Sequence, residues 1–190
     1  MLPLLTPVFL GAVDSLSDTS FAEPTSLPGW TRAHVIAHVH SNAEALQRLV
    51  RWARTGDESR MYASPAQRSE EIESGARLEP GRLRTLVHES AAALDDDLAQ
   101  LTVAERANTV VTGQGRSIPA SEIPWLRCRE VGVHAVDLDT GVTFADLPDE
   151  FLAALAQDVI IKRTANGELA IIAAWLTGRA QTDGPIDAWL

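Results

Sequence analysis

Apolar residues recur every three to four positions over most of residues 1–140, and the alternating pattern of a half-buried strand is scarce. Thr31 is placed as an N-cap, and Pro124 lies in the first turn of the last such segment, which is typical of helix starts. The pattern therefore predicts an all-α protein whose main part is a four-helix bundle, with helices at roughly 7–16, 31–53, 81–101 and 121–140.

Two connections are too long to be simple turns between bundle helices. TGDESRMYASPAQRSEEIESGARLEP, rich in charge and turn formers, predicts a functional crossover loop or a loop with a short helix. VVTGQGRSIPAS favours a second loop with a short extended piece. After Gly141, FADLPDEFLAALAQDVIIKRTA and ELAIIAAWLTGR predict two further helices. We expect a four-helix bundle over residues 1–145 and a short helical extension over residues 146–190.

Charge and composition narrow the possible partners and location. A net charge of -10 disfavours a nucleic-acid partner, because binding to phosphate backbones normally needs a basic surface. The first ten residues, MLPLLTPVFL, are apolar but lack a basic leader and contain two prolines, so they indicate neither a signal peptide nor a membrane span. We therefore expect a cytoplasmic protein. Cys128 is the single cysteine, so no disulfide can form within the chain.

The otherwise apolar segment LRCREVGVHAVDL carries Glu130, His134 and Asp137 along one stripe. Residues four apart lie side by side on a helix, so Glu130 and His134 form a pair. Ionised groups are costly to bury unless they are paired or bind a metal. The stripe therefore predicts either a metal site or a buried pair that joins two helices.

The second helical segment offers three histidines for such a site. His38 falls on the flank of the apolar face, whereas His34 reaches the rim at most and His40 falls on a side expected to be solvated. His38 with Glu130 and His134 makes three ligands of the kind that hold a divalent metal with open coordination positions. Asp137 is then a candidate acceptor for a ligand imidazole.

The alternative to a metal is a buried Glu–His or Glu–Arg pair that merely joins two helices. Arg127 and Arg129 lie within one turn of Glu130 and are the candidate partners for a Glu–Arg pair. Helical spacing alone leaves both interpretations open.

Two stretches, LPGWTRAHVIAHVHSNAEAL and PWLRCREVGVHAVDL, together resemble the mycothiol-dependent maleylpyruvate isomerase family, within the DinB-like superfamily of four-helix metalloproteins. The resemblance implies a divalent metal, usually zinc, held by His38, Glu130 and His134, and mycothiol as thiol cofactor or cosubstrate. MYASPAQRSEEIESGA resembles the family's loop, which implies that Arg68 helps to hold a small acidic substrate. AAWLTGR implies an active-site role for Arg179.

The resemblance implies a reaction in which a metal-activated thiolate attacks a small acidic electrophile, either for cis–trans isomerisation or for S-transfer. Cys128 lies far round the helix from Glu130, so a diffusible thiol fits the site better than the protein's own thiol. Family enzymes usually carry a larger domain before the AAWLTGR helix. The short extension here is therefore expected to weaken isomerisation relative to S-transfer, because isomerisation needs a more enclosed pocket.

Two other functions stay open from the sequence. Two histidines and one carboxylate also form the open facial triad of non-haem iron enzymes. A metal-binding or regulatory module without catalysis would carry the same three ligands. The sequence leaves the oligomeric state open.

Overall fold

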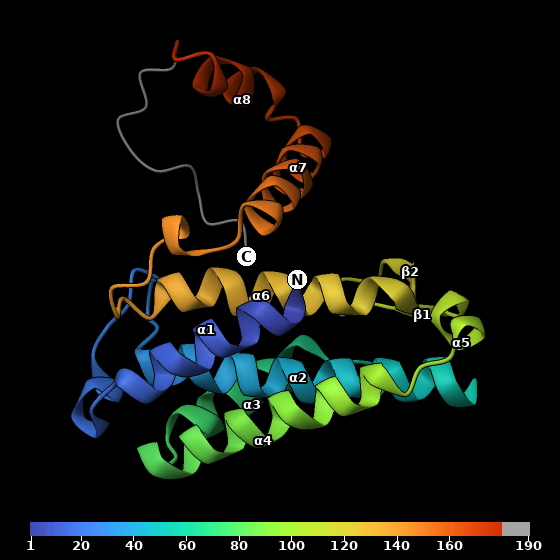
Figure 1. The fold of residues 1–190 in the computed structure, drawn as a ribbon, viewed down its shortest axis with the longest axis horizontal. Coiled ribbons are helices and arrows are strands. Elements are labelled where there is room, and N and C mark those ends of the chain that lie inside the picture. Colours follow the sequence, from blue (N-terminus) through green and yellow to red (C-terminus); the bar gives the residue numbers. More distant parts are fainter. Residues whose placement is uncertain (180–190) are drawn as a thin grey trace. The chain divides into compact units, whose positions relative to one another are not determined.

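Four helices run alongside one another in the computed structural model, which describes residues 1–179. Contacts between α1 and α6, α6 and α2, α2 and α4, and α4 and α1 close the four into a bundle (Figure 1). The predicted all-α, DinB-like four-helix bundle is therefore confirmed. The four helices are α1 (Leu2–Ser15), α2 (Arg32–Thr55), α4 (Pro80–Ala99) and α6 (Ile123–Asp137).

Shorter elements occupy the two long connections. The crossover between α2 and α4 contains a helix, α3 (Pro65–Ala76), that contacts α2. The connection before α6 contains α5 (Val103–Ala107) and an antiparallel hairpin. Its strands are β1 (Thr109–Val111) and β2 (Ser117–Pro119). The loop with a short helix and the short extended piece predicted for these connections are both present. Single 3₁₀ turns lie at Asp18–Ala22, Ala120–Glu122 and Phe144–Asp146.

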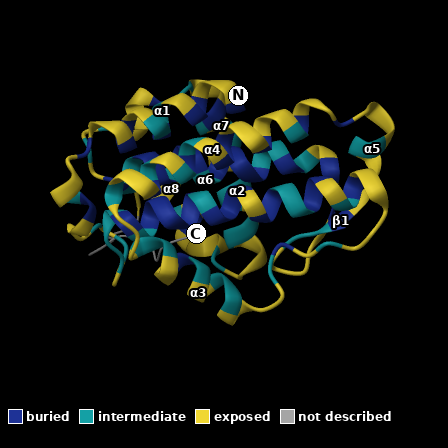
Figure 2. Cartoon of the chain, turned by 90° about the horizontal axis from the view of Figure 1, so that it is seen from below, coloured by how far each residue is buried: buried dark blue, intermediate teal, exposed yellow. Residues whose placement is uncertain are grey.

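Large aliphatic and aromatic side chains from all four bundle helices fill the core. Figure 2 shows the long buried surface of α2, in contrast with the more exposed α3. Each fully buried side chain of this size stabilises the fold by about 1.5–3 kcal/mol. The bundle helices are therefore rigid supports for any side chain that they carry. Core residues include Leu5, Phe9, Ile36, Leu46, Leu49, Leu83, Leu94, Ile123 and Leu138.

The start of α2 is held by local and distant hydrogen bonds. The Thr31 N–H donates to Nδ1 of His34 at 3.2 Å, so a histidine takes the place that glutamate or glutamine usually has in a capping box. Arg32 Nε donates to the carbonyl of Leu138 at 2.7 Å. This bond ties the beginning of α2 to the end of α6.

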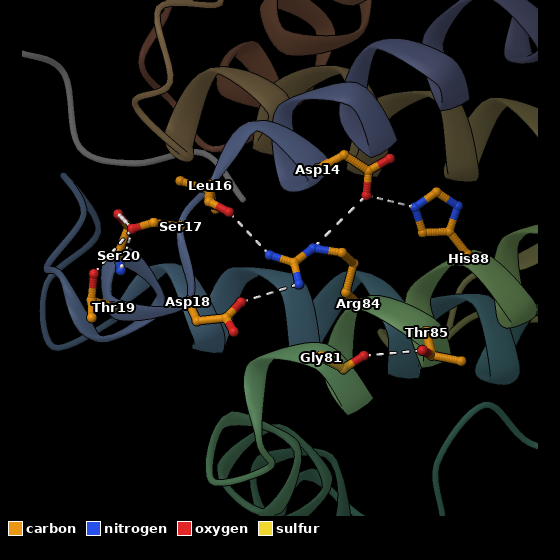
Figure 3. A network of polar contacts seen from close by, with 10 residues as sticks. All are labelled: Asp14, Leu16, Ser17, Asp18, Thr19, Ser20, Gly81, Arg84, Thr85 and His88. Atoms are coloured by element: carbon orange, nitrogen blue, oxygen red, sulfur yellow. Dashed lines mark hydrogen bonds and ion pairs between the residues drawn. The ribbon is translucent and has the colours of Figure 1, made fainter.

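A polar network ties the end of α1 to α4 (Figure 3). Arg84 of α4 donates to the carbonyl of Leu16 at 3.0 Å and to Asp18 at 3.3 Å, and its guanidinium lies over the ring of Phe21. One turn further on, Nε2 of His88 lies 3.0 Å from Asp14. The network is partly exposed, so we assign it to the docking of these segments.

The chain divides into two compact units, Met1–Asp146 and the part from Leu147 onward. The described part of the second unit contains α7 (Asp149–Ala165) and α8 (Leu169–Leu176). Among the described helices, none combines the length and apolar character needed to cross a membrane.

Candidate metal and substrate site

His38 of α2 and Glu130 and His134 of α6 form a buried cluster inside the bundle. One potential ligand atom from each residue lies within 4.8 Å of the other two. Nε2 of His38 lies 2.8 Å from Oε2 of Glu130, and Nε2 of His134 lies 3.5 Å from the same oxygen. The two imidazole rings meet edge to face, with centroids 5.0 Å apart. The structure thus brings together the three residues that helical phase had grouped.

The partners of His134 suit a metal ligand. Its Nδ1 lies 2.7 Å from Oδ2 of Asp137, one turn along α6, as the helical spacing predicted. Its Nε2 is buried and makes no hydrogen bond within residues 1–179. A buried nitrogen that lacks a hydrogen bond carries a free-energy cost unless another partner, such as a metal ion, binds it. Two imidazoles and a carboxylate, with Asp137 orienting one imidazole, fit a divalent cation such as Zn²⁺ with an open position.

The protonation of the cluster follows from burial and close contact. Burial lowers the pKa of His38, which favours the neutral imidazole that a metal requires. Burial opposes ionisation of Glu130, but its close contacts with the imidazoles of His134 and His38 outweigh burial and hold the pKa of this carboxyl well below its usual value. For His134, burial opposes protonation, yet the hydrogen bond to Asp137 and the nearby Glu130 carboxylate raise its pKa to about 9. Glu130 is therefore ionised at neutral pH.

The other two histidines of α2 have different roles. His34 caps the helix and lies 3.5 Å from Glu73. The expectation that His40 faces solvent is wrong. Its side chain is only 12% exposed, and Nδ1 lies 3.0 Å from the hydroxyl of Ser90. Helical phase missed this contact because α4 covers that side of α2.

One cationic and one aromatic side chain border the cluster. Arg68 of α3 places Nη2 3.4 Å from Nδ1 of His38, so the predicted substrate-binding arginine lies next to a predicted metal ligand. Trp30, just before α2, lies edge-on to the His38 ring with centroids 5.4 Å apart. This proximity to His38 was not predicted from the sequence.

Arg179 belongs to the second unit, where it follows α8 and donates to the carbonyl of Thr177 at 2.9 Å. Its active-site role stays a prediction from the family resemblance.

Arg127 connects α6 to the turn of α2 that carries His38. Nη1 donates to the carbonyl of Val39 at 2.7 Å and to Oδ1 of Asn42 at 3.1 Å, and the residue is only 2% exposed. Burial lowers the pKa of this guanidinium to about 10, which still leaves it charged at neutral pH. Arg127 therefore sets the register between the two helices that supply the cluster.

The fold and the cluster define a class of protein, a four-helix bundle with a buried histidine–carboxylate centre. The family model described as Mycothiol maleylpyruvate isomerase N-terminal domain matches residues 4–139. The chain belongs to the mycothiol-dependent maleylpyruvate isomerase family, a family of thiol-dependent isomerases.

Two solved structures support this membership. A crystal structure of the mycothiol-dependent maleylpyruvate isomerase is 43% identical, with a TM-score of 0.85 over 87% of this chain and 69% of that chain. A mutant of that enzyme in which alanine replaces a histidine is 42% identical over the same shares, also with a TM-score of 0.85. No curated protein matches the chain.

Proposed function

We propose that this protein is a mycothiol-dependent isomerase that acts on maleylpyruvate or a closely related small acid with a conjugated cis double bond. The observation that carries the proposal is the cluster of His38, Glu130 and His134, in which Nε2 of His134 is buried without a hydrogen bond inside the described chain. Family membership favours this function over a non-haem iron enzyme or a non-catalytic module.

The three side chains would hold a divalent metal, and we choose zinc because two imidazoles and a carboxylate are among its common ligands. Bound there, the metal would keep the mycothiol sulfur as a thiolate, because coordination deprotonates a thiol. Asp137 fixes the orientation of the His134 imidazole through its 2.7 Å contact. When Nε2 of His38 serves as a ligand, Nδ1 carries the proton and no longer accepts from Arg68. The Arg68 guanidinium is then available to a substrate carboxylate.

The reaction needs no net change in protons or electrons. The thiolate sulfur forms a bond to one carbon of the cis double bond, and the electron pair moves to the conjugated carbonyl oxygen, giving an enolate. The former double bond is now single and rotates. The enolate electrons then return, the carbon–sulfur bond breaks, and the thiolate leaves together with the trans product. Arg68 holds a carboxylate during the rotation, which keeps the adduct in position. In S-transfer, the adduct would instead take up a proton on carbon and leave as a thioether.

The test is metal content and thiol-dependent turnover in single variants. We expect His38→Ala, Glu130→Ala and His134→Ala each to lose stoichiometric metal, measured by elemental analysis, and to lose turnover with mycothiol. His40→Ala is the matched control from the same helix, because His40 contacts Ser90 instead of the cluster. Full metal occupancy in Glu130→Ala would contradict the three-ligand proposal. Oxygen consumption in place of thiol-dependent turnover would favour the iron enzyme.

A further inference from the structure

Trp30 lies at the end of a tight turn that leads into α2. The N–H and the hydroxyl of Thr25 both donate to the Trp30 carbonyl at 3.0 Å, and the Trp30 N–H donates to the carbonyl of Leu27 at 3.0 Å. Gly29 has a φ of 78°, a conformation that glycine adopts at little cost. Both backbone polar groups of Trp30 are therefore paired, and the turn fixes the point from which the indole projects.

The indole of Trp30 lies against two histidines of α2. Its ring is nearly parallel to that of His34, with centroids 6.4 Å apart and an angle of 27° between the planes. It meets the His38 ring edge-on, with centroids 5.4 Å apart and an angle of 61°. Aromatic rings favour such edge-to-face contacts. Nδ1 of His34 lies 2.7 Å from the hydroxyl of Thr31, so the first of these two rings is itself held in place.

His38 lacks the kind of partner that orients His134. Nδ1 of His134 lies 2.7 Å from the carboxylate of Asp137, whereas Nδ1 of His38 lies 3.4 Å from the Arg68 guanidinium. A guanidinium only donates hydrogen bonds, so it cannot accept the proton that Nδ1 carries when Nε2 binds a metal. Within residues 1–179 the only other hydrogen-bond partner of His38 is Glu130, on Nε2. The orientation of the His38 ring therefore depends on the side chains packed against it.

We propose that Trp30 is a positioning residue, whose indole holds the His38 imidazole with Nε2 directed at Glu130, 2.8 Å away. The proposal rests on the proposed function, since it assumes that His38 binds a metal. An indole offers no ligand atom for zinc, so Trp30 acts only through His38. The two imidazoles of the cluster then have different supports, a carboxylate for His134 and an aromatic ring for His38.

The first experiment measures zinc affinity in single variants by competition against a chromogenic chelator. Trp30→Leu keeps an apolar side chain but removes the aromatic ring, and we expect it to weaken zinc binding about 2- to 10-fold, as for the loss of one aromatic pair. Trp30→Phe keeps a ring and should retain most of the affinity. Trp52→Leu is the control, because Trp52 lies about four turns further along α2, roughly 20 Å from His38. The denaturation midpoint of each metal-free variant is measured alongside.

Two spectroscopic measurements separate positioning from stability. The visible spectrum of cobalt(II) reports its coordination geometry, and we expect this spectrum to change in Trp30→Leu but not in Trp30→Phe or Trp52→Leu. The second measurement needs only the parent protein and Trp30→Phe. The chain has five tryptophans, and with 5-fluorotryptophan the signal that is missing from Trp30→Phe belongs to Trp30. We expect that signal to shift and saturate when zinc is added.

Three results would overturn the role of Trp30. The first is a zinc affinity in Trp30→Leu equal to that of the parent protein or to that of Trp52→Leu. The second is an unchanged cobalt spectrum in Trp30→Leu, which would assign the indole to the fold alone. The third is a Trp30 fluorine signal that zinc does not move. None of these measurements uses turnover, so a parent protein that binds zinc without thiol-dependent turnover would contradict the proposed function alone. A parent protein that binds no zinc would contradict both.

Discussion

At the scale of single residues, the contacts of His134 are those expected of a metal-binding imidazole. One ring nitrogen contacts Asp137 at 2.7 Å, while the other is buried near Glu130 without a hydrogen bond in the described chain. A carboxylate on the far nitrogen fixes the tautomer and makes the imidazole a better metal ligand. The properties of this site therefore depend on Asp137 as well as on the three proposed ligands.

Removing the Asp137 carboxylate should weaken metal binding without removing a ligand. We expect Asp137→Asn to lower zinc affinity by about 10- to 100-fold, because the His134 ring loses its charged acceptor. Competition against a chromogenic chelator measures this change. Asp57→Asn, an exposed position after α2, is the control and should bind zinc like the parent protein. Equal affinities in Asp137→Asn and Asp57→Asn would show that Asp137 does not tune the site.

Cys128 should be inert in the folded protein. The side chain is buried, and burial raises the pKa of its thiol to about 11. At pH 8 only about one molecule in a thousand would carry the reactive thiolate, and its fraction would rise with pH. We expect slow reaction with a disulfide reagent in native protein, rapid reaction of one thiol after denaturation, and normal mycothiol-dependent turnover in Cys128→Ala. Loss of turnover with retained metal in Cys128→Ala would make the protein's own thiol a reactant.

At the scale of elements, the site is assembled from three helices. α2 supplies His38, α6 supplies Glu130 and His134, and α3 supplies Arg68. The buried Arg127 ties α6 to α2. α3 has only one buried residue, Ile72, so its position depends heavily on its close contact with α2.

α3 approaches α2 closely at Gly75. A Cβ atom there would be 2.8 Å from the Cβ of Ala37, so Gly75→Ala must displace α3 from α2. We expect a loss of about 1–3 kcal/mol in the free energy of unfolding, as for overpacked cores, and weaker binding of an acidic substrate through Arg68. Chemical denaturation and maleate titration measure the two effects.

A double variant distinguishes this clash from a backbone effect. Ala37→Gly combined with Gly75→Ala removes the clashing atom and should recover substrate binding. Gly81→Ala is a further control, because a Cβ atom at Gly81 meets nothing within 4 Å. An unchanged free energy of unfolding in Gly75→Ala would show that α3 can shift without cost.

At the scale of the whole molecule, an acidic protein is proposed to bind an acidic substrate. The net charge of -10 repels an anion over long range, so local donors must outweigh it at the site. Arg68 beside the cluster provides such a donor. Added salt screens this repulsion and should therefore speed the association of the substrate. The same screening weakens the final contact with Arg68.

The balance between isomerisation and S-transfer is also decided at this scale. The short extension in the sequence predicts weak isomerisation of maleylpyruvate, because holding an adduct through bond rotation needs an enclosed pocket. The proposed function predicts efficient isomerisation instead. The measurement supplies maleylpyruvate with mycothiol and follows both the trans isomer, fumarylpyruvate, and the thioether. A kcat/KM for isomerisation of about 10⁴ M⁻¹s⁻¹ or more would prove the prediction of weak isomerisation wrong. The parent protein without mycothiol is the control for uncatalysed isomerisation.

The sequence by itself determined the helices and grouped the three proposed ligands. Helical periodicity is local, so the bundle helices were predictable, and so was the placement of Glu130 and His134 on one stripe of α6. His38 followed from its place on the flank of an apolar face. The pairing of His134 with Asp137 followed from the spacing along one helix.

Only the tertiary structure decided which surfaces of these helices meet. The burial of His40, the contact of Arg68 with His38 and the close approach of Gly75 to Ala37 each join residues from different helices. The Arg127 bond to Val39 likewise depends on the register between α6 and α2. Periodicity reports the face that a residue occupies on its own helix, but not the helix that covers this face. That choice comes from packing of the whole core, which no local pattern contains.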